Sequence, residues 1–137
     1  MAEQAATLSS FQYKIPKVIS WEFFINNDYD SSSDRGVSMP VQYTVSIEHK
    51  DGQNEATVIL KLSIGEATQK TPFYLDAKIF VELKWDDKLI NDVDKLLEEN
   101  AVVLLLSYLR PMITQFTTYA GLMPFNLPFL DVRKFKK

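Results

Sequence analysis

The sequence has no cysteine, a single histidine and only four glycines among its 137 residues. Without cysteine the chain can form no disulfide, thiolate nucleophile or cysteine-based zinc site, and this composition fits a reducing compartment. The four glycines form no phosphate-binding loop. We expect the lone histidine, His49, to be an exposed side chain without partners, because no constellation of other catalytic residue types accompanies it.

Long apolar runs and a concentrated basic charge are also missing. The longest uninterrupted apolar run, Ala101 to Leu106, is far too short to cross a membrane. The N-terminal residues MAEQAATLSS lack the basic and apolar regions of a signal peptide. The formal net charge of -3 disfavours nucleic-acid binding, because phosphate contacts need a basic surface. We expect a cytoplasmic protein without membrane insertion.

The length is that of one domain. Residues 1–10 are small and polar and are expected to form a flexible tail, which leaves residues 11–137 as a single folded domain. The acidic pairs Asp86-Asp87 and Glu98-Glu99 fall where a turn and a solvated helix face are expected, without convergent ligands. The sequence therefore predicts no catalytic residues, no metal site and no cofactor.

Three segments alternate apolar and polar residues with the period of two that is typical of half-buried strands. The first, Phe11 to Ile25, contains Pro16, which predicts a bulge or an unpaired edge because proline donates no ladder hydrogen bond. The others cover residues 41–64 and Phe73 to Trp85. Between the first two segments, residues 26–40 are rich in Asn, Asp and Ser and predict a long crossover loop.

The segment 41–64 predicts a hairpin centred on Asp51-Gly52, a preferred pair for a two-residue type I′ turn. Folding about that turn places apolar residues opposite apolar residues, whereas a slip of one residue would destroy the match. The expected pairs are Ile47 with Ala56, Val45 with Val58, Tyr43 with Leu60, and Val41 with Leu62. Together with the flanking strands this gives a four-stranded antiparallel sheet with one apolar face.

Residues 86–137 must supply the cover for that apolar face. Leu89 to Leu97 has helical spacing, and Asn100 is expected to cap a new helix start. Pro111 predicts a kink or a late start, since it lacks an N–H, and Gly121 predicts the C-terminal stop. One stripe suits the sheet: Val102, Leu105, Leu106, Leu109, Ile113 and Phe116.

A second group widens this stripe to about half of the helix circumference or more, at roughly 100° per residue. It consists of Leu104, Tyr108, Met112 and Tyr119. A surface helix normally shows a narrower stripe. Either a second copy of the chain covers the excess, which makes these four residues an oligomer interface, or the C-terminal segment folds back over it. We favour self-association.

Aromatic side chains beyond the needs of a core lie in the loop (Tyr29), in two strands (Phe24, Tyr74 and Phe80) and in the C-terminal segment GLMPFNLPF. Beside a long acidic loop, they suit a groove that binds extended apolar polypeptide. The expected substrate-binding residues are Tyr29, Tyr43, Phe125 and Phe129.

At this point the sequence resembles the SecB family of export chaperones over nearly its whole length. FQYKIPKVISWEFF, at 11–24, is similar to the first strand of that family, and SIGE, at 63–66, is similar to its Ser-Leu-Gly-Glu. NAVVLLLSYLRPMITQF resembles the long helix, with Leu-x-x-Tyr-x-Arg at Leu105 to Arg110. LPFLDVRKF stands in the place of the closing helix. The order and spacing of these segments carry the resemblance.

The resemblance implies an α+β, SecB-like fold: a four-stranded antiparallel sheet with a long C-terminal helix and a short closing helix on one face. It implies a homotetramer, a dimer of dimers with the long helices at the interface. It further implies that the exposed sheet face binds the zinc-bearing tail of a SecA-type motor. Glu22, Ile64 and Glu66 match such positions, whereas Val18 stands where the family has an acid.

The resemblance implies a chaperone that binds unfolded or partly folded polypeptides without ATP, and since no catalytic constellation is present we do not expect an enzyme. Its expected clients are preproteins for export, which it keeps from folding or aggregating. Two alternatives stay open: a SecB-like chaperone of an antitoxin, and an adaptor or structural oligomer whose wide helical stripe is consumed by assembly. Strong binding of a hydrophobic dye by the intact oligomer would favour a chaperone over an adaptor.

Overall fold

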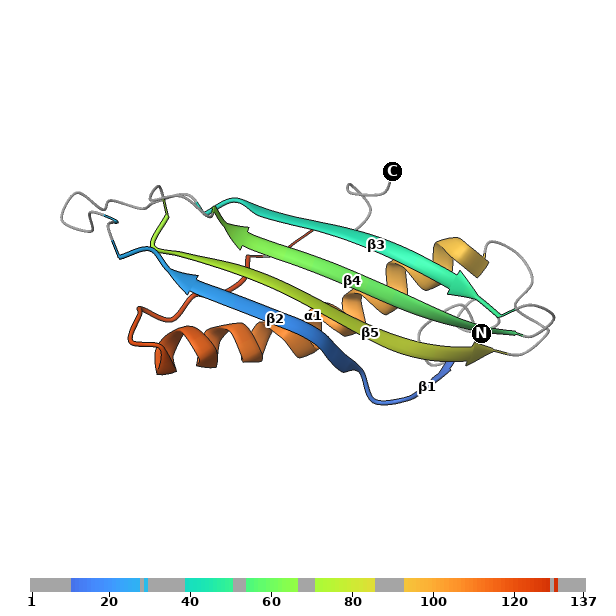
Figure 1. Ribbon diagram of the computed structural model, residues 1–137. Coiled ribbons are helices and arrows are strands. Elements are labelled where there is room, and N and C mark those ends of the chain that lie inside the picture. Colours follow the sequence, from blue (N-terminus) through green and yellow to red (C-terminus); the bar gives the residue numbers. More distant parts are fainter. Residues whose placement is uncertain are drawn as a thin grey trace.

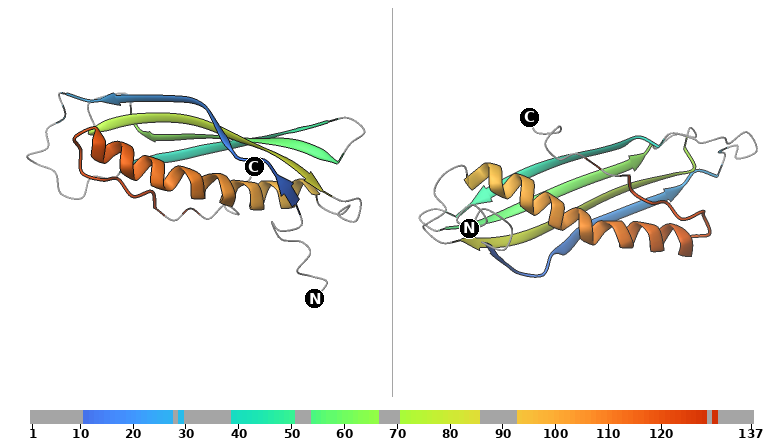
Figure 2. Two further views of the ribbon diagram at one scale, coloured as in Figure 1. Left: turned by 90° about the horizontal axis from the view of Figure 1, so that it is seen from below. Right: turned by 180° about the vertical axis from the view of Figure 1, so that it is seen from behind.

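The computed structural model describes residues 11–27, 29, 39–50, 54–66, 71–85, 93–128 and 130. Within them an antiparallel sheet lies on a single long helix (Figures 1 and 2). The strands are β1 (Phe11–Tyr13), β2 (Lys17–Ile25), β3 (Val41–His49), β4 (Glu55–Gly65) and β5 (Phe73–Trp85), and the helix is α1 (Val93–Tyr119). This confirms the α+β class, with five strands in place of four.

The strand order explains the long connection after β2. The sheet runs β1-β5-β4-β3, and β2 pairs with β5 along the same edge as β1. β2 and β3 therefore lie on opposite sides of the β5-β4 pair, and the chain between them must cross the sheet. The predicted crossover is confirmed by this topology, although most of residues 26–40 and the N-terminal residues 1–10 lie outside the described residues.

The expected first strand is divided at Pro16, which confirms the predicted interruption. A second irregularity follows, because the pairing with β5 shifts by one residue between Val18 and Ser20. The single alternation predicted for this segment is therefore wrong. Ile15 is 75% exposed and Ile19 is 50% exposed, since the proline ends one ladder and the bulge changes the phase of the next.

The hairpin of β3 and β4 is present, but its predicted register is wrong by two residues. Ile47 pairs with Val58 rather than Ala56, and the Lys50 N–H donates to the Glu55 carbonyl (3.1 Å). Four residues therefore lie between Lys50 and Glu55, although the Asp51-Gly52 turn itself lies outside the described residues. A two-residue slip keeps every apolar side chain on the same face, so the alternation could not detect it.

The core lies between the sheet and α1. β5 is the central strand, with the bounds predicted from sequence, and its odd-numbered residues from Phe73 to Leu83 are buried. They pair across the sheet with the buried even-numbered residues of β4, from Ala56 to Ile64. Leu97, Leu105 and Leu109 of α1 complete this core from the other side.

The helix is longer and more continuous than predicted. It runs from Val93 through Pro111 to Tyr119, so neither a late start at Pro111 nor a new start at Asn100 occurs. Asn100 is not an N-cap: it lies inside the helix, and its side-chain amide donates to the Leu96 carbonyl one turn earlier (3.0 Å). Pro111 is tolerated on an exposed side of the helix.

Gly121 ends the helix as predicted. Its φ of 90° lies in the left-handed region, where a residue with a Cβ is strained. The Gly121 N–H donates to the Thr118 carbonyl (3.1 Å) and the Leu122 N–H to the Thr117 carbonyl (3.0 Å), which satisfies the last turn. The predicted short closing helix falls largely outside the described residues.

Candidate functional site

Exposed apolar side chains lie near the ends of β2 and α1. Phe24 is 56% exposed, Tyr119 is 82% exposed and Met123 is 85% exposed, and Ile25 is exposed beside them in the sequence of β2. The ribbon views place the C-terminal end of α1 and the end of β2 at the same end of the molecule (Figures 1 and 2). We call these four residues the apolar end.

A cluster of aromatic rings underlies the apolar end, between β2 and the last turns of α1. Phe116 meets Trp21 edge-on at a centroid distance of 5.4 Å and Phe23 at 4.8 Å. Phe23 also packs on Phe73 (5.4 Å), which in turn meets Phe125 of the C-terminal segment (5.8 Å). The sequence patterns placed Trp21, Phe23, Phe73 and Phe116 singly on apolar faces and Phe125 in the predicted groove. They gave no signal that β2, α1 and the C-terminal segment would bring these rings together.

Polar contacts brace the strand ends at this end of the sheet. The Asn26 side-chain amide donates to the carbonyls of Thr71 (2.6 Å) and Glu66 (3.2 Å), which joins the segments after β2, after β4 and before β5. The buried Thr71 hydroxyl accepts from the Glu66 N–H (3.0 Å) and donates to the Phe73 carbonyl (2.9 Å). This brace was not predictable from the sequence, because none of its residues belongs to a recognisable motif.

The C-terminal segment folds back along α1. The Phe125 N–H donates to the Thr117 hydroxyl (2.9 Å), and the Thr114 hydroxyl donates to the Phe125 carbonyl (3.2 Å). The Arg110 guanidinium donates to the Leu127 carbonyl (2.5 Å). The polar side of the helix thus holds the returning backbone, while the buried Leu127 joins the core. Part of the helix surface is covered in this way within a single chain.

The structure brings the described members of the predicted groove to one end of the sheet. Tyr43 lies near the start of β3 and Tyr29 follows the end of β2, where its N–H donates to the Asn26 carbonyl (3.0 Å). Phe125 packs on Phe73 at the start of β5. All three are half-buried. Phe129 lies outside the described residues, and client binding by these residues stays a prediction.

The four residues of the predicted oligomer interface differ in exposure. Leu104 is buried in the single chain and Met112 is half-buried against the core. Tyr108 is 38% exposed, and Tyr119 is far more exposed. A second copy of the chain would therefore contact the two tyrosines, with Met112 between them on the helix. Self-association through this stripe stays a prediction.

The sheet face turned away from α1, which we call the outer face, carries only part of the predicted motor-docking set. Glu22 of β2 and Glu66 after β4 are exposed, and Glu22 pairs with Asp76 of β5. Ile64 is fully buried on the other face of the sheet, so its expected place beside Glu22 and Glu66 is wrong. The reason is the alternation of β4, whose even-numbered residues all point into the core.

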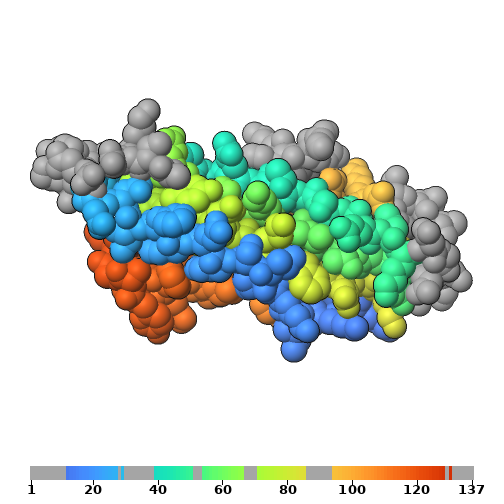
Figure 3. All heavy atoms as spheres, viewed as in Figure 1, coloured from blue at the N-terminus to red at the C-terminus, as the bar shows by residue number. Residues whose placement is uncertain are grey.

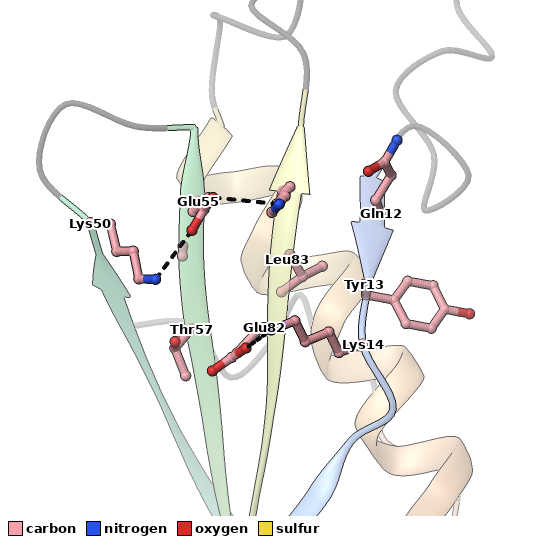
Figure 4. A pocket seen from close by; sticks show the side chains of 10 residues that line it. Gln12, Tyr13, Lys14, Lys50, Glu55, Thr57, Glu82 and Leu83 are labelled. Atoms are coloured by element: carbon pink, nitrogen blue, oxygen red, sulfur yellow. Dashed lines mark ion pairs between the residues drawn. The ribbon is translucent and has the colours of Figure 1, made fainter.

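A polar hollow of about 270 Å³ opens at the opposite end of the sheet (Figure 4). Lys14 pairs with Glu82 (3.2 Å), while Glu55 lies between Lys50 (3.3 Å) and Lys84 (3.8 Å). These contacts are lysine–carboxylate pairs that link the strand ends. Throughout the described part of the chain, no cluster of three or more His, Cys, Asp and Glu residues is arranged to hold a metal ion.

His49 is exposed, but the expectation that it has no partner is wrong. Its Nε2 lies 2.6 Å from a carboxylate oxygen of Asp94, in the first turn of α1, and its ring meets Trp85 edge-on (6.2 Å). The pair links the end of β3 to the start of the helix. Because the Asp94 carboxylate is 73% exposed, this contact is a surface link of small energetic weight.

Two comparisons place the fold among known proteins. The chain superimposes on the SecB-like chaperone Rv1957 of Mycobacterium tuberculosis, solved with a ChAD peptide from the antitoxin HigA1, with a TM-score of 0.69 and 13% sequence identity over 90% of this chain and 92% of that one. It also resembles a protein of unknown function from Streptococcus agalactiae, with a TM-score of 0.50 and 13% identity over 87% and 97% of the two chains. The fold is therefore SecB-like.

Sequence comparison adds one relative. An uncharacterized protein of Methanocaldococcus jannaschii is 27% identical over 114 residues, which cover 81% of this chain and 72% of that protein. No family model matches the sequence. In the described part of the chain, no helix combines the length and apolar character that a membrane crossing requires.

Proposed function

We propose that this protein is an ATP-independent chaperone that binds unfolded or partly folded polypeptides and keeps them from folding or aggregating. The observation that carries the proposal is the apolar end: large side chains are left in solvent on a fold shared with a SecB-like chaperone. Such an exposed apolar surface marks a binding site for other polypeptides. Its contacts are non-directional, so many client sequences can be accepted.

The edges of the sheet support the same proposal. β3 pairs only with β4 among the described strands, so its outer edge offers backbone donors and acceptors to an extended client. Half-buried Tyr43 lies on this strand, and half-buried Phe125 lies at the same end of the sheet. Backbone pairing would supply affinity without sequence preference, and the aromatic side chains would select apolar segments.

Two client classes follow. The first is preproteins held for export, with a SecA-type motor receiving them at Glu22 and Glu66. The second is an antitoxin, which is favoured by the antitoxin peptide bound to the Mycobacterium tuberculosis SecB-like chaperone. Competition separates the two: a short antitoxin peptide that displaces an unfolded preprotein at equimolar concentration supports the second class.

Aggregation provides the first test of the proposal. An aggregation-prone client is diluted from denaturant with and without the intact protein, in the absence of nucleotide, and light scattering is followed. The proposal predicts that scattering falls as the ratio of protein to client rises, whereas equal amounts of serum albumin leave it unchanged. Undiminished scattering, together with weak binding of a hydrophobic dye, would support a non-chaperone adaptor instead.

A further inference from the structure

The outer face carries charged rows that cross the sheet at right angles to the strands. Glu22 and Asp76 are directly opposite each other on β2 and β5 and form an acidic row. Two residues further along β5, Lys78 lies opposite Lys61 of β4 and forms a basic row. Neither lysine makes an ion pair with a described residue, and like charges placed opposite each other destabilise a sheet.

An apolar row flanks the charged pair on each side. Beyond the acidic row, Phe24 of β2 stacks on Tyr74 of β5, with a centroid distance of 6.2 Å and an interplanar angle of 22°. Beyond the basic row, Phe80 of β5 pairs with Ile59 of β4, and Lys17 of β2 lies next to Phe80. Along β5 the outer face therefore presents, in order, an apolar, an acidic, a basic and an apolar residue: Tyr74, Asp76, Lys78 and Phe80. When a second copy faces it with the strand running in the opposite direction, the acid of each copy lies against the base of the other and apolar residues lie against apolar residues. The face is the one turned to the viewer in Figure 3.

We propose that the outer face binds a second copy of this chain, through a two-fold axis that lies midway between the two facing sheets, parallel to them and at right angles to the strands, between the acidic and basic rows. Rotation about this axis sets Asp76 of one copy against Lys78 of the other, and Tyr74 against Phe80. In the same register Phe24 meets Lys17, a cation–π pair. On β4 the side chain of Ile59 meets Gly65, where no side chain stands in its way.

The charge pattern also selects this orientation over the other two-fold arrangement. An axis along the strands, between β5 and β4, would set Lys78 of one copy against Lys61 of the other. Two such like-charge contacts would form at the centre of the interface, where they are least screened. The axis between the rows brings no like charges together among the described residues of the four rows. A protein of other sequence would need to reproduce this pattern, whereas a second copy already carries it.

The size of the face sets the strength of the association. Four strands spaced by about 4.8 Å and four rows spaced by about 7 Å cover roughly 500 Å² per chain. That area is at the lower end of specific interfaces, so the association should be weak and concentration-dependent. Stacked sheets cross at about 30°, and the overlap is therefore best at the centre. Asp76 and Lys78 lie close to that centre, so they should contribute most to the strength of the association.

Charge reversal at these two positions tests the proposal with the full-length chain. Sedimentation velocity over a range of concentrations should show a dimer that forms as the concentration rises and that weakens with salt. Asp76→Lys and Lys78→Asp should each lower the association constant at least tenfold. Mixing the two variants in equal amounts should restore it, because every Lys then meets an Asp of the other copy, and the double variant D76K/K78D should also regain it. Lys95→Asp, on an exposed position of α1, is the matched control and should leave the association constant unchanged.

Association through α1 would not respond to these changes, so the two interfaces are distinguishable. The proposal is overturned if each single variant associates like the wild type, or if the mixture associates no better than its components. A wild-type chain whose mass is constant at all concentrations and salt levels would also overturn it, and would leave the outer face to a different protein. Circular dichroism melting of each variant confirms that the folded state is retained.

Discussion

At the scale of single residues, Gly65 shows why the end of β4 has its particular sequence. Its φ is 82°, a conformation that residues with a Cβ rarely adopt, and an added Cβ would collide with the Phe73 carbonyl. Next to it, the Thr71 hydroxyl and the Asn26 amide hold the strand ends together. The glycine of the SIGE segment, met in the sequence as part of a family resemblance, is thus a requirement of backbone geometry.

Replacement of this glycine gives the first prediction. Gly65→Ala should lower the free energy of unfolding by on the order of 2–4 kcal/mol, because conformational strain adds to a steric clash. Gly121→Ala is the matched control: its φ is also positive, but an added Cβ meets nothing within 4 Å, so only the strain of about 1–2 kcal/mol remains. Urea unfolding of both variants measures the difference, and an equal loss in the two would contradict this account of Gly65.

The apolar end gives a second prediction at this scale. Met123→Asp should weaken binding of an unfolded client severalfold with little effect on stability, because the side chain is almost fully in solvent and a charge there repels apolar segments. Phe125→Asp should weaken binding too, with an added loss of stability from its contact with Phe73. Fluorescence anisotropy of a labelled unfolded client measures the affinity. Gln115→Asp, exposed on α1, should bind like the wild type, and a loss as large as that of Met123→Asp would point to non-specific charge effects.

At the scale of elements, β5 and the β3–β4 hairpin show what a hydrophobic pattern determines. The period of two located β5 at its observed bounds and assigned its buried face, because burial on one side requires strict alternation. The same pattern left the hairpin register open in steps of two, and the register predicted from a two-residue turn differs from the observed pairing of the strands. The register between two strands depends on the turn that joins them, whereas the side of the sheet on which a side chain lies depends on the alternation of apolar and polar residues.

The helix shows a different limit. Its apolar stripe was predictable from spacing, but the two suspected starts were not boundaries, because Asn100 and Pro111 are both accommodated inside the helix. The brace around Asn26 and the aromatic cluster around Phe116 were not predictable from local sequence. Both depend on contacts between segments far apart in the chain, and no sequence motif predicts such contacts.

The exposed side of α1 carries the third prediction. Tyr108→Glu combined with Tyr119→Glu should dissociate a helix-mediated oligomer, because two charges would be buried at the contact without partners. Val103→Glu is the control, since Val103 is also exposed but lies roughly 140° around the helix from Tyr108. Light scattering at micromolar concentration should show a mass of several 15.8 kDa chains for the wild type and for the control variant. A monomeric wild type at this concentration would refute self-association through α1.

At the scale of the whole molecule, the two faces of the sheet have different surroundings. One face is covered by α1 and the returning C-terminal segment, which together bury the core and carry the exposed side chains of Tyr119 and Met123. The outer face is free of this cover and carries charged and aromatic rows, including the Phe24 ring that stacks on Tyr74. Substitutions at Tyr119 and Met123 can therefore test the proposed client binding separately from substitutions at Asp76 and Lys78, whereas a change at Phe24 would affect both.

The outer face gives the fourth prediction, for a SecA-type motor. Glu22→Lys with Glu66→Lys should weaken motor binding and its salt dependence without changing affinity for unfolded clients, because exposed carboxylates attract a basic partner from the outer side only. Surface plasmon resonance with an immobilised motor measures this. Wild type and double variant binding equally would show that Val18, which stands where an acid is expected, marks a chain with another partner. A motor on this face would also compete with the second copy.

The central claim is that the intact protein holds unfolded polypeptides without nucleotide. The most direct measurement is the refolding rate of a slow-folding client, followed by fluorescence, with excess protein and no ATP. Because only the free client folds, a protein concentration ten times the dissociation constant should slow refolding by about tenfold, and an excess of a competing unfolded chain should restore the rate. A refolding rate that is the same with and without the protein, at low and at high salt, would contradict the account.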